Sequence, residues 1–334
     1  MKAMVLRNPK PIEQEPLILT ELPKPRLGSN ELLLKVSACG VCHTDLHTVE
    51  GELEIPKLPV IPGHQIVGVI EEVGEGVRNF SVGDRVGVTW LNSACGRCEY
   101  CRQGLENLCE KARFTGLHAS GGYAEYAMVP ADYAFPIPEG FPDIQAAPLL
   151  CAGVIGYRSL RLSEIKPGQN LGLYGFGASA RVYIRIARHW GCRVFVFTRS
   201  KEHRRHADEL GAVWTGGAGD DLPERMDSSI IFAPVGWIVP EALRVLKKNG
   251  TLAINAIHMS SIPGLKYDLI YYELTVRSVA NLTRQDAGEL LRLAAEIPIR
   301  TDVQIFSLED ANKVLQLLKQ SKIRGAAVLS IDAE

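Results

Sequence analysis

Short apolar runs, interrupted by Gly and Pro, make up the first 145 residues of the chain. The runs at 67–73, 85–89 and 123–129 are rich in Val, Ile or Tyr, which favours strands over helices. No sustained period of 3.6 residues appears in this part of the chain. We therefore expect residues 1–150 to form a mostly β domain.

After residue 152 the pattern changes to apolar strands that alternate with helices, which is typical of a parallel sheet covered on both faces. From about residue 301 it becomes strand, helix (308–320) and strand (326–331). We divide the chain into 1–150, 151–284 and a segment, 285–334, that returns to complete the first domain. Between 152 and 301 the predicted strands are 170–174, 193–197, 229–232, 251–256 and 275–279, and the predicted helices are 178–190, 201–210 and 239–247.

Composition and charge exclude several classes of protein. The 334 residues include 37 Lys and Arg against 38 Asp and Glu, without the basic block that nucleic-acid binding needs. No apolar run reaches the roughly 18 residues that cross a bilayer. Charge at Lys2 and Arg7 comes too early for a signal peptide. We expect a cytoplasmic protein with no nucleic-acid or membrane partner.

A glycine-rich motif directly follows the predicted strand 170–174. Gly175, Gly177 and Ala180 match the pattern G-x-G-x-x-G/A at the start of a predicted helix. The first glycine allows a tight turn, the second lets the backbone approach a pyrophosphate, and a small third residue allows close packing. The motif predicts a doubly wound Rossmann domain that binds a dinucleotide, with a glycine-rich turn that binds no ligand as the alternative.

The end of the next strand indicates which dinucleotide binds. An NAD-binding fold places an acid there to hold the ribose 2′-hydroxyl, but this chain has Thr198, Arg199 and Ser200 and no acid before Glu202. A guanidinium and two hydroxyls suit a 2′-phosphate better. We predict that NADP(H) is favoured, with a solvated basic loop that also tolerates NAD(H) as the alternative.

Eight cysteines in a chain without an export signal favour metal binding or thiol chemistry over disulfides. Cys95, Cys98, Cys101 and Cys109 supply four thiolates within 15 residues, which predicts a closed tetrahedral zinc site of structural type. An iron–sulfur cluster is the main alternative.

The remaining cysteines leave two interpretations open for a second site. Cys39 and Cys42 form a C-x-x-C pair that would suit a thioredoxin-like redox motif. Alternatively, one thiolate from this pair joins His64 and Cys151. Two cysteines, one histidine and water are the ligands of a zinc that polarises an alcohol or carbonyl oxygen.

The whole chain resembles the zinc-dependent medium-chain alcohol dehydrogenases. The resemblance rests on segment 39–47, the turn at Gly63 and His64, the four-cysteine lobe, segment 150–153 and the glycine-rich turn, all in family order. The stretch 151–157 and the loop around Arg199 are most similar to the branch related to cinnamyl alcohol dehydrogenases. The resemblance implies a GroES-like catalytic domain, a Rossmann domain, two zinc ions per chain and a homodimer or homotetramer.

The resemblance also assigns roles to single residues. Cys42, His64 and Cys151 would bind the catalytic zinc, leaving Cys39 a bystander, and Asp45 would orient His64. In the same way, the resemblance implies proton relay by Thr44 and His47, contacts to the cofactor pyrophosphate by His43 and Arg324, and a substrate pocket lined by Leu53 and Trp90.

Gln65 departs from the family, which usually has Glu after the ligand histidine. A carboxylate behind the metal would add a negative charge that Gln65 does not supply. Its absence lowers the pKa of water or alcohol at the metal. We therefore expect retained activity with a pH optimum shifted downward.

Together these motifs predict an alcohol dehydrogenase or aldehyde reductase that transfers hydride between a primary alcohol and a nicotinamide cofactor. Leu53, where some relatives have a larger aromatic residue, suggests room for bulky or aromatic substrates. One alternative is a non-catalytic protein that binds zinc and a dinucleotide. The other is an NADPH:quinone oxidoreductase on the same fold, although those relatives generally lack the cysteines present here.

Overall fold

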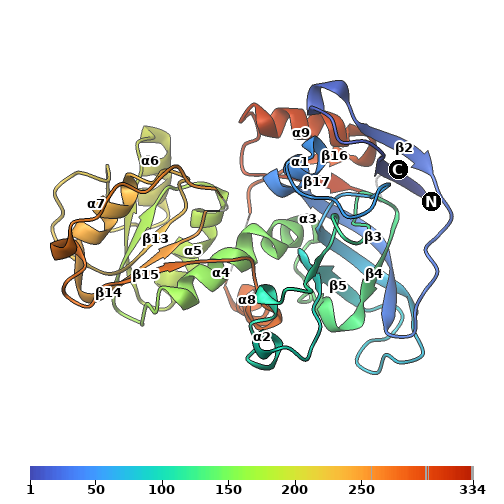
Figure 1. The fold of residues 1–334 in the computed structure, drawn as a ribbon, viewed down its shortest axis with the longest axis horizontal. Coiled ribbons are helices and arrows are strands. Elements are labelled where there is room, and N and C mark those ends of the chain that lie inside the picture. The colour runs from blue at the N-terminus through green and yellow to red at the C-terminus, as the bar shows by residue number, and fades with distance from the viewer. Residues whose placement is uncertain (257, 298, 300, 332–334) are drawn as a thin grey trace. The chain divides into compact units, whose positions relative to one another are not determined.

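The computed structural model describes residues 1–256, 258–297, 299 and 301–331. The chain divides into two compact units (Figure 1). Unit 1 holds Met1–Cys151, Asn281–Glu296 and the described residues from 301 onward, whereas unit 2 holds Ala152–Ala280 with Ile297 and Ile299. Among the described residues, no helix is both long enough and apolar enough to cross a membrane.

Unit 2 is built on one parallel sheet with the strand order β12-β11-β10-β13-β14-β15. The chain starts in the middle with β10, moves outward to β12 and then crosses to the other side of β10, which is the Rossmann order. The strands are β10 (Asn170–Tyr174), β11 (Arg193–Phe197), β12 (Trp214–Gly216), β13 (Met226–Ile231), β14 (Leu246–Ile254) and β15 (Thr275–Ser278).

Helices cover the sheet of unit 2, with α5 and α7 on opposite sides of it (Figure 1). α7 contacts β10, β13 and β14, whereas α5 contacts β11 and α6 contacts β12. This arrangement confirms the predicted α/β class with a doubly wound parallel sheet. The helical segments are α4 (Ala152–Leu162), α5 (Ala178–His189), α6 (Lys201–Glu209), α7 (Ile238–Arg244) and the 3₁₀ turn η5 (Tyr267–Leu269).

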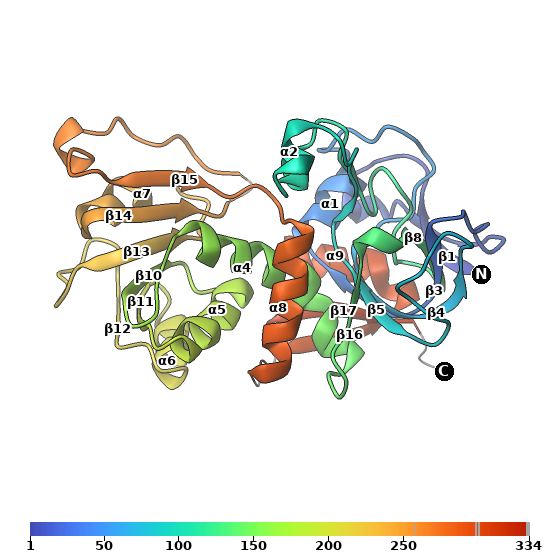
Figure 2. The same cartoon turned by 90° about the horizontal axis from the view of Figure 1, so that it is seen from below.

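Unit 1 is mostly β, and its largest sheet has the order β16-β17-β3-β4-β5-β9, with β8 also paired to β3. Two small sheets, β1-β2 and β6-β7, accompany it. Figure 2 labels β16, β17, β3, β4 and β5 of the largest sheet. The strands are β1 (Lys2–Leu6), β2 (Leu17–Glu21), β3 (Glu31–Val41), β4 (Gln65–Val73), β5 (Arg85–Val88), β6 (Leu91–Ser93), β7 (Arg113–Phe114), β8 (Tyr126–Pro130), β9 (Ala134–Pro136), β16 (Val303–Ser307) and β17 (Ala326–Ser330).

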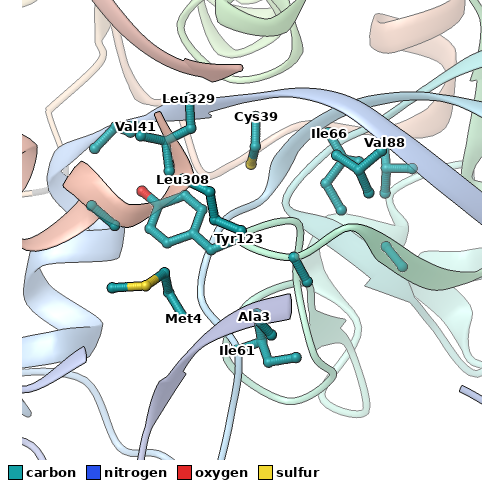
Figure 3. Packing of buried hydrophobic residues seen from close by; sticks show 14 of the residues in the cluster. Ala3, Met4, Cys39, Val41, Ile61, Ile66, Val88, Tyr123, Leu308 and Leu329 are labelled. Carbon is teal, nitrogen blue, oxygen red and sulfur yellow. The ribbon is translucent and has the colours of Figure 1, made fainter. Parts of the chain in front are cut away.

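The core of unit 1 gathers buried side chains from both ends of the chain, including Ala3, Cys39, Tyr123 and Leu329 (Figure 3). Short helices surround the sheet. These are α1 (His43–Glu50), α2 (Glu99–Arg102), α3 (Asp143–Ala146), α8 (Arg284–Glu296) and α9 (Ala311–Lys319), with 3₁₀ turns η1 (Ile12–Gln14), η2 (Glu106–Leu108), η3 (Ala131–Tyr133), η4 (Ala147–Leu150) and η6 (Leu308–Asp310).

The structure corrects the sequence analysis at helix α1, because no helical pattern was recognised before residue 145. α1 spans only eight residues, and Leu46 and Val49 are its buried apolar side chains. Its start is fixed by a capping box. The Cys42 sulfur accepts a hydrogen bond from a backbone N–H of the first turn, and the Asp45 carboxylate accepts one from Cys42 N–H. Cysteine is not a usual cap residue, so the sequence carried little signal for this helix.

Candidate active site and metal centres

Cys42, His64 and Cys151 come together in unit 1, where one ligand atom from each lies within 4.8 Å of the others. β3 and β4 are paired so that Gly40 faces Gln65. Cys42 directly follows β3 and His64 directly precedes β4, so this pairing brings the two residues together. Cys151 follows η4. We name these three residues the Cys–His–Cys site.

The Cys–His–Cys site fits a zinc ion. Cys42 Sγ lies 3.4 Å from His64 Nε2. Zn–S bonds of about 2.3 Å and Zn–N bonds of about 2.0 Å in a tetrahedron separate two such ligand atoms by roughly 3.5 Å. The third residue completes the two-thiolate, one-imidazole set of catalytic zinc sites, which leaves one coordination position open.

Asp45 fixes the orientation of His64. Its Oδ1 accepts from Gly63 N at 3.2 Å and lies 2.9 Å from His64 Nδ1, while its Oδ2 accepts from Cys42 N at 2.9 Å. His64 is 1% and Asp45 is 2% exposed. Burial raises the pKa of Asp45, although the neighbouring His64 acts to lower that pKa. The contact to Nδ1 leaves Nε2 directed toward the two cysteines, as a metal ligand requires.

Cys39 lies outside the Cys–His–Cys site. It is buried in β3, and its thiol donates weakly to the carbonyl of Gly40 at 3.7 Å. Burial raises the pKa of Cys39 well above its ordinary value, whereas a hydrogen bond from Cys151 lowers that of Cys42. The pair also sits in an antiparallel part of the sheet rather than a βαβ unit, so the structure gives no support to the thioredoxin-like alternative.

The second cluster consists of Cys95, Cys98, Cys101 and Cys109, whose sulfurs lie within 4.8 Å of one another. Cys95 and Cys101 sulfurs are 3.9 Å apart. Backbone N–H groups, including that of Cys98 at 3.3 Å, donate to Cys95 and lower its pKa to about 6. The spacing fits one tetrahedral ion. An iron–sulfur cluster would hold the thiolates farther apart, because several atoms would lie between them.

Glu106 anchors the four-cysteine lobe to α8. It lies on η2 between the last two cysteines and is 4% exposed. Its Oε1 accepts from Arg284 Nε at 2.9 Å and from Arg284 N at 3.2 Å. The Arg284 guanidinium also lies 5.3 Å from the centre of the Tyr133 ring. This contact is not predictable from the sequence, since nothing in the local spacing links residues so far apart.

Thr44 and His47, the predicted relay residues, lie one turn apart on α1. Thr44 is buried and its backbone N–H donates to Cys42 Sγ at 3.3 Å. His47 Nδ1 lies 2.5 Å from Glu52 Oε2. Glu52 was not predicted from the sequence. Its position five residues after His47 was the signal that could have suggested this contact. His43 is exposed at the start of α1.

The predicted pocket residue Trp90 lies next to His64 of the Cys–His–Cys site, with 6.3 Å between ring centres. Trp90 stacks on Phe114 at 4.3 Å, and Phe114 meets the edge of His118 at 5.4 Å. These rings form an aromatic row that begins at the Cys–His–Cys site. Phe114 and His118 were not anticipated from the sequence. Leu53, the other predicted pocket residue, is half-buried beyond α1.

The glycine-rich turn lies in unit 2 at the carboxyl end of β10. Gly175 has φ +92°, a conformation that glycine adopts without strain, and its N–H donates to the carbonyl of Phe197. Gly177 precedes α5 with open space where a Cβ would stand, and Ala180 is fully buried. The open backbone and the helix start suit an approaching pyrophosphate.

Thr198, Arg199 and Ser200 follow β11, the strand next to β10. Ser200 Oγ caps α6 by accepting from His203 N at 3.2 Å, and Arg204 Nε donates to the carbonyl of Thr198 at 2.9 Å. These contacts hold the loop, while Arg199 is exposed. Arg324, the other predicted pyrophosphate contact, is exposed in unit 1 just before β17.

Comparison with known proteins identifies the family. The alcohol dehydrogenase GroES-like domain matches residues 28–139. The probable alcohol dehydrogenase AdhA of Mycobacterium tuberculosis is 45% identical over 99% of this chain and 97% of its own length. A cinnamyl alcohol dehydrogenase from Sorghum bicolor has a TM-score of 0.87 and 27% identity, over 98% of this chain and 97% of its own.

A further solved structure, CAD from Helicobacter pylori complexed with NADP(H), has a TM-score of 0.86 and 25% identity. The match covers 100% of this chain and 100% of that chain. Together with the Cys–His–Cys site and the Rossmann order of the second unit, these similarities show that the chain belongs to the zinc-dependent medium-chain alcohol dehydrogenase family, with the branch related to cinnamyl alcohol dehydrogenases among its relatives.

Proposed function

We propose that this protein is a cytoplasmic zinc-dependent alcohol dehydrogenase that also acts as an aldehyde reductase. The observation that carries the proposal is the Cys–His–Cys site, whose buried histidine and half-buried cysteines fit zinc with one open position and whose histidine is oriented by Asp45. A second zinc, held by the four-cysteine cluster, gives two ions per chain.

Different residues of unit 1 would serve metal binding and proton transfer. Zinc supplies a Lewis acid for the alcohol or carbonyl oxygen, and the nicotinamide supplies or takes the hydride. Thr44, buried beside Cys42, would hold the proton of the substrate hydroxyl. His47, one turn away on α1 with its Nδ1 next to Glu52 Oε2, would accept the proton that Thr44 gives up.

NADP(H) is the favoured cofactor in this proposal. Arg199 is exposed on a loop that Ser200 and Arg204 hold in place, so its guanidinium is accessible to a 2′-phosphate.

The substrate is a primary alcohol or its aldehyde, aromatic or bulky ones included. Support comes from the aromatic row of Trp90, Phe114 and His118. Flat rings favour offset-stacked or edge-to-face contact with another ring. Since the row starts at His64, an aromatic substrate would keep its oxygen near the metal.

A homodimer or homotetramer completes the proposal. β15 is an edge strand of the unit 2 sheet, and all four of its residues are exposed. Tyr267, Tyr271, Tyr272 and Val276 are large exposed apolar side chains in the same region. An unpaired strand edge with exposed aromatic residues is a usual place for chains to associate. Light scattering coupled to gel filtration measures the mass.

The deciding experiment is oxidation of NADPH and, separately, of NADH in the presence of an aromatic aldehyde, on protein whose zinc content has been measured. We expect turnover with two zinc ions per chain and a higher kcat/KM for NADPH. Arg199→Ala should raise the KM for NADPH about 10-fold and leave that for NADH nearly unchanged. No turnover at full zinc occupancy would replace the proposal by the non-catalytic binding protein.

A further inference from the structure

Tyr123 is a buried residue to which none of the roles above applies. It is 0% exposed and lies among the packed side chains of the unit 1 core (Figure 3). Its backbone N–H donates to the carbonyl of Pro62 at 3.0 Å, and the preceding Gly122 N–H donates to the carbonyl of Gly63 at 2.9 Å. The segment that carries Tyr123 is therefore paired with the segment that leads into His64.

The ring of Tyr123 is also in contact with this segment. Gly63 has φ +95°, and a Cβ on Gly63 would stand 2.4 Å from Cδ1 of Tyr123. No side chain fits between this backbone and the ring. Gly63 thus allows the Tyr123 ring to cover the turn directly before the metal ligand.

The hydroxyl of Tyr123 has no hydrogen-bond partner among the described residues. A buried donor without a partner costs free energy, so such a group in a native core calls for an explanation. Asp45 is a charged group bonded to the turn that the ring covers, since its Oδ1 accepts from Gly63 N at 3.2 Å. After burial, which is the largest cause, Asp45 and Cys39 raise the pKa of Tyr123 well above its ordinary value.

Asp45 has room for one more donor. Its Oδ1 has two partners, His64 Nδ1 and Gly63 N, whereas Oδ2 has the backbone N–H of Cys42. A carboxylate offers about four acceptor positions over its two oxygens. Asp45 accepts from Gly63 N and the Tyr123 ring lies against Gly63, so the carboxylate and the buried hydroxyl belong to the same part of the core.

We propose that Tyr123 is a positioning residue, whose hydroxyl donates to the Asp45 carboxylate and thereby holds the group that orients His64. This inference rests on the proposed function, because it requires a metal ion at the Cys–His–Cys site. Tyr123 contacts neither metal nor substrate, so its influence passes through Asp45 and His64. Loss of the hydroxyl loosens His64 and speeds the release of the ion.

The test is Tyr123→Phe, which removes the hydroxyl and keeps the ring over Gly63. Tyr174→Phe is the matched control, because Tyr174 is also fully buried with a hydroxyl that has no partner among the described residues, but lies in unit 2. We expect zinc to pass from the Cys–His–Cys site to a chromogenic chelator about 10-fold faster in Tyr123→Phe. Tyr174→Phe should release zinc at the rate of the unaltered protein.

Two further measurements separate positioning from a merely structural role. In protein reconstituted with Co²⁺, Tyr123→Phe should shift the visible bands of the cobalt–thiolate site, and Tyr174→Phe should not. In the Asp45→Asn background, Tyr123→Phe should add less than 2-fold to zinc release, because the partner of the hydroxyl is already altered. An additional 10-fold effect in that background would overturn the inference.

The remaining outcomes are equally decisive. A lower unfolding temperature for Tyr123→Phe with unchanged zinc release and cobalt bands would assign the hydroxyl to stability alone and overturn the inference. Equal zinc contents in the unaltered protein and Cys42→Ser would mean that the Cys–His–Cys site holds no ion. That result would overturn the proposed function and this inference with it, whereas loss of one zinc ion in Cys42→Ser leaves the inference to stand or fall on Tyr123→Phe.

Discussion

The two candidate metal clusters of unit 1 are assembled in different ways. Cys95, Cys98, Cys101 and Cys109 come from a single stretch of 15 residues, and backbone N–H groups within or just after this stretch donate to Cys95 and Cys109. The Cys–His–Cys site draws on three separate segments, brought together by the pairing of β3 with β4 and by the turn after η4. The first needs only its own loop, but the second needs the whole unit to be folded.

The clusters differ in charge as well as in construction. Four thiolates give a zinc ion a net charge of about −2 and leave it no open position, whereas two thiolates and a neutral imidazole give a net charge near zero. The less negative site is the stronger Lewis acid. The comparison predicts that damage to the Cys–His–Cys site removes chemistry and that damage to the four-cysteine cluster removes stability.

The largest expected effect is that of Cys42→Ser. A Lewis acid supplies several kcal/mol to the transition state, so its loss should lower kcat/KM for an aromatic aldehyde by at least about 1,000-fold. Binding of NADPH, measured by fluorescence titration, should stay nearly unchanged. Cys39→Ser is the matched control, since Cys39 lies outside the site. Substantial activity in metal-free Cys42→Ser would contradict the zinc mechanism.

Cys101→Ser alters the four-cysteine cluster and should therefore lower stability rather than activity. Removing one of four ligands from a structural zinc should cost about 4 kcal/mol of unfolding free energy, which is roughly a 10 °C fall in Tm. At temperatures where the variant is folded, kcat should remain within about 2-fold of the unaltered protein. A large fall in kcat without a change in Tm would reverse the assigned roles.

Glu106→Gln tests whether the four-cysteine cluster stabilises more than its own loop. The carboxylate is buried while the Arg284 side chain is about half exposed, so water compensates part of the lost ion pair. We expect a loss of about 1–2 kcal/mol in urea unfolding. Glu224→Gln is the control, because the Arg193–Glu224 pair is exposed on both sides and should give no measurable change. Equal effects in the two variants would show that burial of Glu106 is unimportant.

The smallest effect is expected from Gln65→Glu. Gln65 is buried, and its side chain packs against Gly40, so a carboxylate of the same shape can take its place. The added negative charge near the metal should raise the pKa that limits alcohol oxidation. The pH–rate profile should move upward by up to about one unit, with kcat at its optimum little changed. An unmoved profile would refute this electrostatic account of Gln65.

The sequence predicted best what depends on local spacing. Strands 170–174 and 193–197 match β10 and β11 at both ends, because continuous apolar runs between turn residues leave little choice. The four cysteines were recognised for the same reason. Resemblance to the family, rather than spacing, selected Cys42, His64 and Cys151 for the second site. The structure brings their ligand atoms together, and their metal-binding role stays a prediction.

What the sequence did not reveal depends on long-range contact. Glu106 meets Arg284, Trp90 meets Phe114, and Tyr123 lies against Gly63 only because β-pairing folds distant segments onto one another. Helix α1 escaped notice because the local signal at its start is a cysteine. The roles assigned to Thr44, His47 and Leu53 stay predictions, since each concerns a substrate or cofactor contact.

The place of β17 has a consequence for how this protein is made. This strand, near the end of the chain, lies between β16 and β3, and it pairs with β3 at Cys39, Gly40 and Val41, directly before Cys42. During synthesis all three ligand residues leave the ribosome long before residues 326–330. The strand beside them is made after them, so we expect zinc to be captured at the Cys–His–Cys site only once residues 326–330 have also left the ribosome and paired with β3.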